Sequence, residues 1–181
     1  MPDVTLAPVT RADAAELIGG NLESREHHRP WMAPFTDQAG FDAWFGRTLT
    51  GPHVGLVARE AASGRVVGVV NLMEIVANPF FQGAYLGYYG MAALAGRGLM
   101  TEAVRLATAH AFGALGLHRL EANIQPGNTR SIALVRRLGF RLEGFSPRYL
   151  RVDGEWRDHE RWALLADEAG CSASTPGSAA R

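Results

Sequence analysis

Hydrophobic residues recur with period two in some stretches of the chain and with helical spacing in others. The strand-like stretches cover residues 4–9, 53–60, 65–76, 83–91, 118–124, 141–152 and 155–165. The helix-like stretches cover residues 10–18, 98–115 and 126–140, and the less regular region 21–50 is interpreted as a short helix, a loop and a second helix. This order of elements predicts an α/β or α+β domain with a mixed sheet.

Turn and capping residues mark several of the boundaries. Asn128 is a typical helix N-cap, and Asp153-Gly154 predicts a tight hairpin between the last two strands. The strand at 83–91 leads through a glycine-rich turn into the helix at 98–115, which is followed by the strand at 118–124. This succession is typical of a strand–helix–strand crossover.

Length, charge and cysteine content narrow the class of protein. Residues 1–166 of the 181 are expected to form one domain, and the small, polar residues 167–181 are expected to form a disordered tail. Lys+Arg and Asp+Glu are both 18, so no global charge favours nucleic acid or a membrane surface. The single Cys171 and the lack of a secretory signal favour the cytoplasm. His27 and His28 have no third ligand at a suitable spacing, so no metal site is predicted.

The stretch LAGRGLMTEA, residues 94–103, places glycines at the start of a helix. Free N–H groups and the helix dipole favour an anion there, and Gly96 and Gly98 would let a diphosphate approach the main chain. The alternative is a simple tight turn. The dinucleotide-binding pattern G-x-G-x-x-G is excluded because its third glycine position is Thr101, and no phosphate loop ending in G-K-[ST] is present.

Several longer motifs then resemble a known superfamily. YLGYYGM, GRGLMTEA, LHRLEANIQPGNTRSIALVRRLGF and LRVDGEWRDHERWAL are similar to the GCN5-related N-acetyltransferases, and within them to the ribosomal-protein alanine N-acetyltransferases of the RimJ/RimL group. The resemblance covers about residues 4–165, although Ala95 and Met100 depart from the usual phosphate turn. It implies a mixed, mostly antiparallel sheet with splayed middle strands and flanking helices.

The resemblance also implies acetyl-CoA as the co-substrate. Its pyrophosphate is expected on the N–H groups of residues 97–101, and its pantetheine arm along the strand at 86–91. An N–H of that strand, at Tyr89 or Gly90, is expected to stabilise the oxyanion. The residues predicted to bind the donor are Tyr88, Tyr89, Gly90, Met91, Gly96, Arg97, Gly98, Leu99, Met100, Thr101, Asn128 and Ser131.

The catalytic groups are less well marked. Many members of the superfamily carry a tyrosine acid four residues after Ser131, but this chain has Val135 there, so Ser131 or a water that it holds is the predicted proton donor. Glu121, Glu74 and Asp158 are candidate bases, and Glu121 is the one assigned. The alternative for each carboxylate is an ordinary solvated charge on a strand.

Together these features predict an acetyltransferase in which a primary amine attacks directly, without a covalent enzyme intermediate. The expected acceptor is the N-terminal α-amine of a protein, by resemblance a ribosomal protein, and the expected state is a monomer or homodimer. Two alternatives stay open: acetylation of an antibiotic, polyamine or amino acid, and a non-catalytic acyl-CoA-binding module. Trp31 and Phe35 are interpreted either as walls of the acceptor groove or as core.

Overall fold

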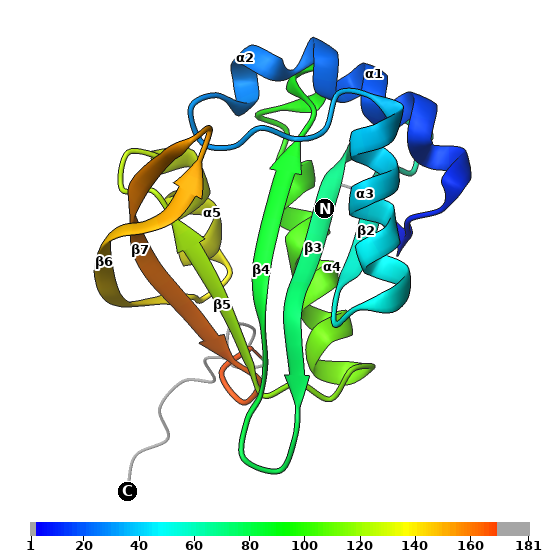
Figure 1. The fold of residues 1–181 in the computed structure, drawn as a ribbon. Helices are drawn as coiled ribbons and strands as arrows, with labels where there is room; N and C mark the ends of the chain where they lie inside the picture. Colours follow the sequence, from blue (N-terminus) through cyan, green and yellow to red (C-terminus); the bar gives the residue numbers. More distant parts are fainter. Residues whose placement is uncertain (1–2, 170–181) are drawn as a thin grey trace, which may run out of the picture.

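Seven strands form one twisted sheet in the computed structural model, which describes residues 3–169 (Figure 1). In spatial order they are β1 (Val4–Pro8), β2 (Val54–Glu60), β3 (Val66–Ala77), β4 (Gln82–Gly90), β5 (Arg119–Ile124), β7 (Glu155–Leu165) and β6 (Arg141–Val152). Only β4 and β5 run parallel, and all other neighbours are antiparallel. The predicted α+β fold with a mixed, mostly antiparallel sheet is confirmed.

The two central strands part soon after they pair. β4 and β5 are paired only from Gly83 to Tyr85 and from Arg119 to Glu121. Beyond this point β4 stays with β3 as far as Gly90, while β5 stays with β7 as far as Ile124. The sheet therefore splits along its middle, as predicted, and leaves one edge of β4 without a strand partner.

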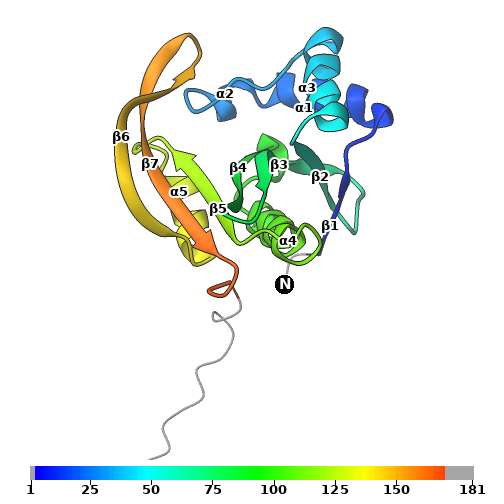
Figure 2. The same cartoon turned by 60° about the horizontal axis from the view of Figure 1, so that its bottom comes forward.

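Helices cover both faces of the sheet (Figure 2). The N-terminal layer holds a short 3-10 turn (Arg11–Asp13), α1 (Ala14–Glu23), α2 (Arg25–His28) and α3 (Gln38–Thr50). The opposite layer holds α4 (Leu99–Gly113) and α5 (Thr129–Arg137). A second 3-10 turn (Ala92–Leu94), which the hydrophobic pattern did not predict, joins β4 to the glycine-rich turn.

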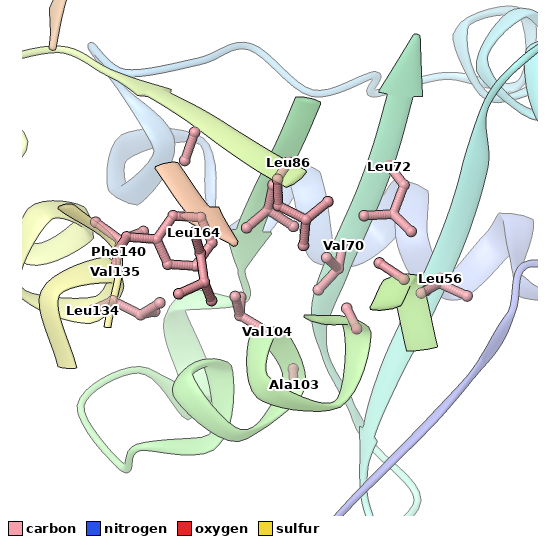
Figure 3. Close-up of a cluster of buried hydrophobic side chains, with 14 of the residues drawn as sticks. Leu56, Val70, Leu72, Leu86, Ala103, Val104, Leu134, Val135, Phe140 and Leu164 are labelled. Carbon is pink, nitrogen blue, oxygen red and sulfur yellow. The ribbon is translucent and has the colours of Figure 1, made fainter. Parts of the chain in front are cut away.

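Each layer is fastened to the sheet by its own apolar cluster. On the α4 side, Val70 and Leu86 of the sheet meet Ala103 and Val104 of the helix (Figure 3). On the other side, Leu17 of α1 and Phe41 and Phe45 of α3 pack against β2, β3 and the end of β4. Burial on both faces fixes β4 in place, and the end of β4 forms one wall of the candidate site.

The structure defines the ends of two predicted segments. The stretch predicted as a helix over 126–140 holds α5, which begins at Thr129 directly after the predicted N-cap Asn128 and ends at Arg137, before the positive φ of 90° at Gly139. The predicted tail starts at 167, but residues 166–169 form a turn in which Glu168 pairs with Arg141 at 2.6 Å. The rest of the predicted tail lies outside the described residues. Within residues 3–169, no helix is long and apolar enough to cross a membrane.

Candidate functional site

A cavity of about 640 Å³ lies between the end of β4 and the N-terminus of α5. Its walls come from α2 and the residues after it, from β4, from the glycine-rich turn with the first turn of α4, and from α5. All the residues predicted to bind the donor line this one cavity: Tyr88, Tyr89, Gly90, Met91, Gly96, Arg97, Gly98, Leu99, Met100, Thr101, Asn128 and Ser131. Segments that are distant in sequence thus meet around a single space.

The glycine-rich turn has the geometry of an anion site. Gly96 and Gly98 both have a φ of 77°, a left-handed conformation that residues with a side chain rarely adopt. Gly98 is the N-cap of α4 and has no side chain to satisfy the first N–H groups of the helix. The N–H groups of Leu99, Met100 and Thr101 therefore have no partner within the helix, and their residues line the cavity. A diphosphate is the kind of ligand that satisfies them.

Positive charge around the cavity is distributed unevenly. Arg97, in the turn itself, forms an ion pair with Glu60. The Ser63 hydroxyl and the Arg97 guanidinium together hold the pKa of Glu60 below its usual value. Arg130 and Arg137 of α5 are exposed and line the same cavity, and neither forms an ion pair within residues 3–169.

These two arginines are absent from the residues predicted to bind the donor. Their spacing of seven places them on one face of α5, and that face also carries the cavity wall. A search for basic residues at helical spacing after the capping Asn128 would have found them.

The free edge of β4 is defined by the alternation of its peptide groups. Met91 donates to Val67 of β3 at 2.8 Å, and the antiparallel register assigns Tyr89 to Val69 in the same way. The peptide groups of Tyr88 and Gly90 therefore point to the other side, where β5 has moved away. The two residues predicted as alternative oxyanion donors therefore differ: the register directs the Tyr89 N–H to β3, and only the Gly90 N–H faces the gap.

Ser131 is paired with the hydroxyl of Tyr88, a residue that was predicted only to bind the donor. The Tyr88 hydroxyl lies 2.7 Å from Ser131 Oγ, across 43 residues of sequence. Asn128 Oδ1 accepts from the Ser131 N–H at 3.2 Å, which confirms Asn128 as the N-cap. Burial raises the pKa of Tyr88 to about 12, and the hydrogen bond to Ser131 opposes this rise. Tyr88 therefore stays a neutral proton donor near neutral pH.

Glu121 does not line the cavity. It lies on β5 opposite Tyr85, where the two central strands begin to separate, and its carboxylate accepts from Arg119 at 2.7 Å. The pKa of Tyr85 is raised above its ordinary value, first by its hydrogen bond to Tyr149 and then by burial and by the carboxylates of Glu121 and Glu74. Two tyrosines and two carboxylates thus share the narrow end of the split, outside the cavity.

The other two candidate bases also have partners. Glu74 lies 3.6 Å from the His53 ring, and Asp158 accepts from the backbone N–H of Arg148 at 2.7 Å. Asp158 therefore stabilises the bend of the last hairpin, which is a structural role. Glu74 adopts a positive φ of 51° at a bulge of β3, so it belongs to the same irregular end of the sheet as Tyr85.

Trp31 and Phe35, each expected either in the wall of the acceptor groove or in the core, have different surroundings in the structure. Trp31 lines the cavity, whereas Phe35 is partly buried and packs against the core, edge-to-face on Phe41 and tilted on Trp44, with ring centroids 5.5 Å and 5.2 Å away. His27 and His28 both line the cavity. In the described part of the chain, no group of three His, Cys, Asp or Glu side chains is placed to hold a metal ion.

Comparison with known proteins gives consistent matches. The profile of the acetyltransferase (GNAT) domain family matches residues 3–141. The [ribosomal protein uS5]-alanine N-acetyltransferase of Escherichia coli is 41% identical over 167 residues, which cover 86% of this chain and 84% of that protein. The probable N-acetyltransferase YjcK of Bacillus subtilis is 38% identical over 113 residues, 62% of this chain and 61% of that protein. The structure of Mycobacterium smegmatis RimJ in complex with CoA-disulfide superposes with a TM-score of 0.83 at 32% identity, covering 94% of this chain and 85% of that one.

Proposed function

Because the chain belongs to the GNAT family of acetyl-CoA-dependent N-acetyltransferases, we propose that it acetylates the N-terminal α-amine of a protein, by similarity a ribosomal protein. The Escherichia coli enzyme acts on an alanine of a ribosomal protein, and it is similar to this chain over most of the chain's length. This similarity supports the same kind of acceptor. A ribosomal-protein acceptor also implies that the reaction takes place in the cytoplasm. The observation that carries the chemistry is the meeting of the glycine-rich turn, the free edge of β4 and the Tyr88–Ser131 pair in one cavity.

The residues around the cavity fit an acyl-CoA donor. The unpaired N–H groups of residues 99–101 suit its diphosphate, and Arg130 and Arg137 add positive charge beside them. The peptide groups of Tyr88 and Gly90 offer the edge of a strand to the amides of its pantetheine arm. When bound, acetyl-CoA supplies an acyl carbon that is activated by its bond to sulfur.

Tyr88 and Ser131 are proposed to stabilise the leaving sulfur. The pKa of Tyr88, about 12, lies well above the ~8.5 of a simple thiol. The pair therefore lowers the energy of the developing charge by hydrogen bonding and keeps its own protons at the end of the reaction. The attacking amine loses one proton in the reaction, and the released CoA thiol gains one, so the protons balance. The Gly90 N–H is proposed to donate to the developing oxyanion.

The acceptor is proposed to approach the narrow end of the split, where Glu121 lies beside Tyr85. The Glu121 carboxylate already accepts a hydrogen bond from Arg119. A protein N-terminus suits such a site, because its α-amine has a pKa of about 7.7–8.0 and is partly neutral near neutral pH. A lysine side chain, with a pKa of about 10.4, costs roughly 3 kcal/mol more to deprotonate.

Acetylation of two matched peptides tests the proposal. One peptide has a free N-terminal alanine, and the other has a blocked N-terminus and one internal lysine. Thiol release and the peptide mass should show acetylation of the first peptide only. The 18 basic residues of this chain are all arginine, so lysine acetylation of the enzyme itself cannot add to the signal.

Three outcomes would contradict the proposal. Preference for the lysine peptide, or turnover of polyamines or aminoglycosides with none of peptides, would overturn the acceptor assignment. Binding of CoA with no turnover of any amine would favour a non-catalytic acyl-CoA-binding module.

A further inference from the structure

A line of buried polar side chains joins the N-terminal helices to the end of β4. Asn21, Ser24 and His28 are three of the five buried polar residues within residues 3–169, and their spacing of three and four places them on one helical face. Each contacts a different residue at or just after the end of β4. The Asn21 amide donates to the Tyr89 hydroxyl at 3.4 Å, and the Ser24 hydroxyl accepts from the Ala92 N–H at 3.0 Å.

The third contact involves the strand edge that lines the cavity. His28 Nε2 lies 2.9 Å from the carbonyl oxygen of Gly90. A carbonyl oxygen only accepts, so Nε2 carries the proton of this hydrogen bond. Nδ1 is buried and has no partner among the described residues, so the ring is held as the neutral Nε2–H form. Its edge-to-face contact with Tyr89, with centroids 5.2 Å apart, fixes its orientation further.

Gly90 is the position at which this hydrogen bond matters for the cavity. The peptide groups of Tyr88 and Gly90 face the gap that β5 leaves, so the Gly90 carbonyl has no strand partner. His28 supplies the donor that a neighbouring strand would otherwise provide. The Tyr88 peptide and the Gly90 N–H are left available on the same edge.

The segment that carries His28 is also anchored on the far side of the gap. Gln125, just beyond β5, donates from its side chain to the Trp31 carbonyl at 3.1 Å. The Trp31 ring lies so close to Gly127 that a Cβ there would come within 3.0 Å of it. Residues 28–31 therefore bridge the two sides of the split, and His28 is their contact with β4.

We propose that His28 is a positioning residue for the acyl donor: by donating to the Gly90 carbonyl it holds the free edge of β4 in register with the donor's amide arm. This inference rests on the proposed function, because it assumes an acyl-CoA donor on that edge. It differs from a purely structural role, because it makes donor affinity depend on one N–H group at the position of Nε2. Glutamine carries an amide N–H at the same number of bonds from Cβ, whereas leucine has no donor.

Steady-state kinetics of His28→Gln and His28→Leu, with the N-terminal alanine peptide as acceptor, test the inference. His28→Leu should raise the KM for acetyl-CoA by about tenfold, whereas the KM for the peptide changes by less than about twofold. His28→Gln should restore a KM for acetyl-CoA close to that of the wild type. His159→Leu is the matched control: this histidine is equally buried and also bonds a backbone carbonyl, but it lies outside the cavity and should leave the KM for acetyl-CoA unchanged.

Equal KM values for wild type and His28→Leu, a failure of glutamine to restore the value, or an equal effect of His159→Leu would overturn the inference. A wild-type protein that shows no thermal shift with CoA would overturn the proposed function and this inference with it. If His28→Leu does not fold, ¹⁵N NMR of the wild-type imidazole decides. The Nε2–H form should be observed and its Nε2 resonance should shift on addition of CoA, and an unchanged resonance would overturn the inference.

Discussion

The contact between Tyr88 and Ser131 shows how the site depends on single residues. Ser131 is held by two local features, its place in the first turn of α5 and its N–H bond to Asn128. Its hydroxyl, however, meets a tyrosine from another element at 2.7 Å. The proposed hydrogen-bond donor to the leaving sulfur is therefore a pair of hydroxyls, and its tyrosine comes from β4 rather than from position 135 of α5, which is Val135.

Removing either hydroxyl should slow the chemical step. We expect Ser131→Ala and Tyr88→Phe each to lower kcat by about 10- to 100-fold, with the Kd for CoA changed by less than about threefold. The double variant should be little worse than the worse single one, because the two groups act as a unit. Rapid-quench or steady-state rates together with CoA titrations measure both quantities. Thr50→Ala, which removes an exposed hydroxyl from α3, is the control; unchanged kcat in Ser131→Ala would return Ser131 to a purely structural role.

The arginines around the cavity should differ in their contribution to donor binding. Arg97 is neutralised by Glu60, whereas Arg130 and Arg137 form no ion pair within residues 3–169. The double variant Arg130→Gln/Arg137→Gln should weaken CoA binding by about 5- to 10-fold and reduce its dependence on salt, because exposed charges act through screened attraction. Arg97→Gln should have a smaller effect. Calorimetric titration at low and high ionic strength measures this, and a larger loss for Arg97→Gln would contradict it.

At the scale of elements, the glycine-rich turn connects a strand edge to a helix N-terminus. The turn needs a left-handed residue at Gly98, and it also needs space for a ligand beside the N–H groups of α4. Gly116, beyond the other end of α4, also needs the left-handed conformation, with a φ of 63°. Nothing lies within 4 Å of a Cβ added there, and no ligand site is assigned to it. Substitutions at Gly98 and at Gly116 therefore distinguish the effect of backbone strain from the effect on ligand binding.

Gly98→Val and Gly116→Val form a matched pair. Both should lower the free energy of unfolding by roughly 1–3 kcal/mol, since a β-branched residue is strained at positive φ. Only Gly98→Val should abolish the rise in Tm that CoA causes in the wild type by binding the folded state. Thermal unfolding with and without CoA measures both effects. A CoA-induced rise in Gly98→Val equal to that in Gly116→Val would contradict the assignment of the turn to the diphosphate.

At the scale of the whole molecule, stability should depend on pH through two buried histidines. Burial lowers the pKa of His28, with a smaller contribution from neighbouring His27, and burial also lowers the pKa of His159. A histidine with a lowered pKa binds fewer protons in the folded than in the unfolded state. The contribution of such a neutral histidine to the stability of the folded state is complete above pH 6.5, its ordinary pKa. This contribution is lost as the pH falls below that value.

The free energy of unfolding should therefore fall by on the order of 1 kcal/mol between about pH 7.5 and about pH 5.5, which corresponds to about 2–4 °C in Tm for a chain of this size. His28→Gln and His159→Gln should each remove part of this dependence. Denaturant unfolding across the pH range measures it. A constant stability, or variants with the same pH profile as the wild type, would show that neither ring is kept neutral by the fold.

Features that depend on neighbouring residues could be predicted from the sequence. The last two strands were predicted at 141–152 and 155–165, which are the observed bounds of β6 and β7, because Asp153-Gly154 forms the turn between them with positive φ at both residues. The cap at Asn128, the glycine-rich turn and the crossover from β4 to β5 were predicted for the same reason. Turn chemistry and periodicity act over a few residues, so the sequence carries them directly.

The tertiary structure alone decided which of these local features act together. Tyr88 meets Ser131 across 43 residues, Arg97 meets Glu60 across 37, and His28 meets Gly90 across 62. It also decided that Glu121 pairs with Arg119 and lies outside the cavity, and that the Tyr89 N–H is taken by β3. These pairings follow from the order of strands in the sheet and from the point at which β4 and β5 part. Both are set by how the two apolar faces of the sheet are buried together, which no local stretch of sequence specifies.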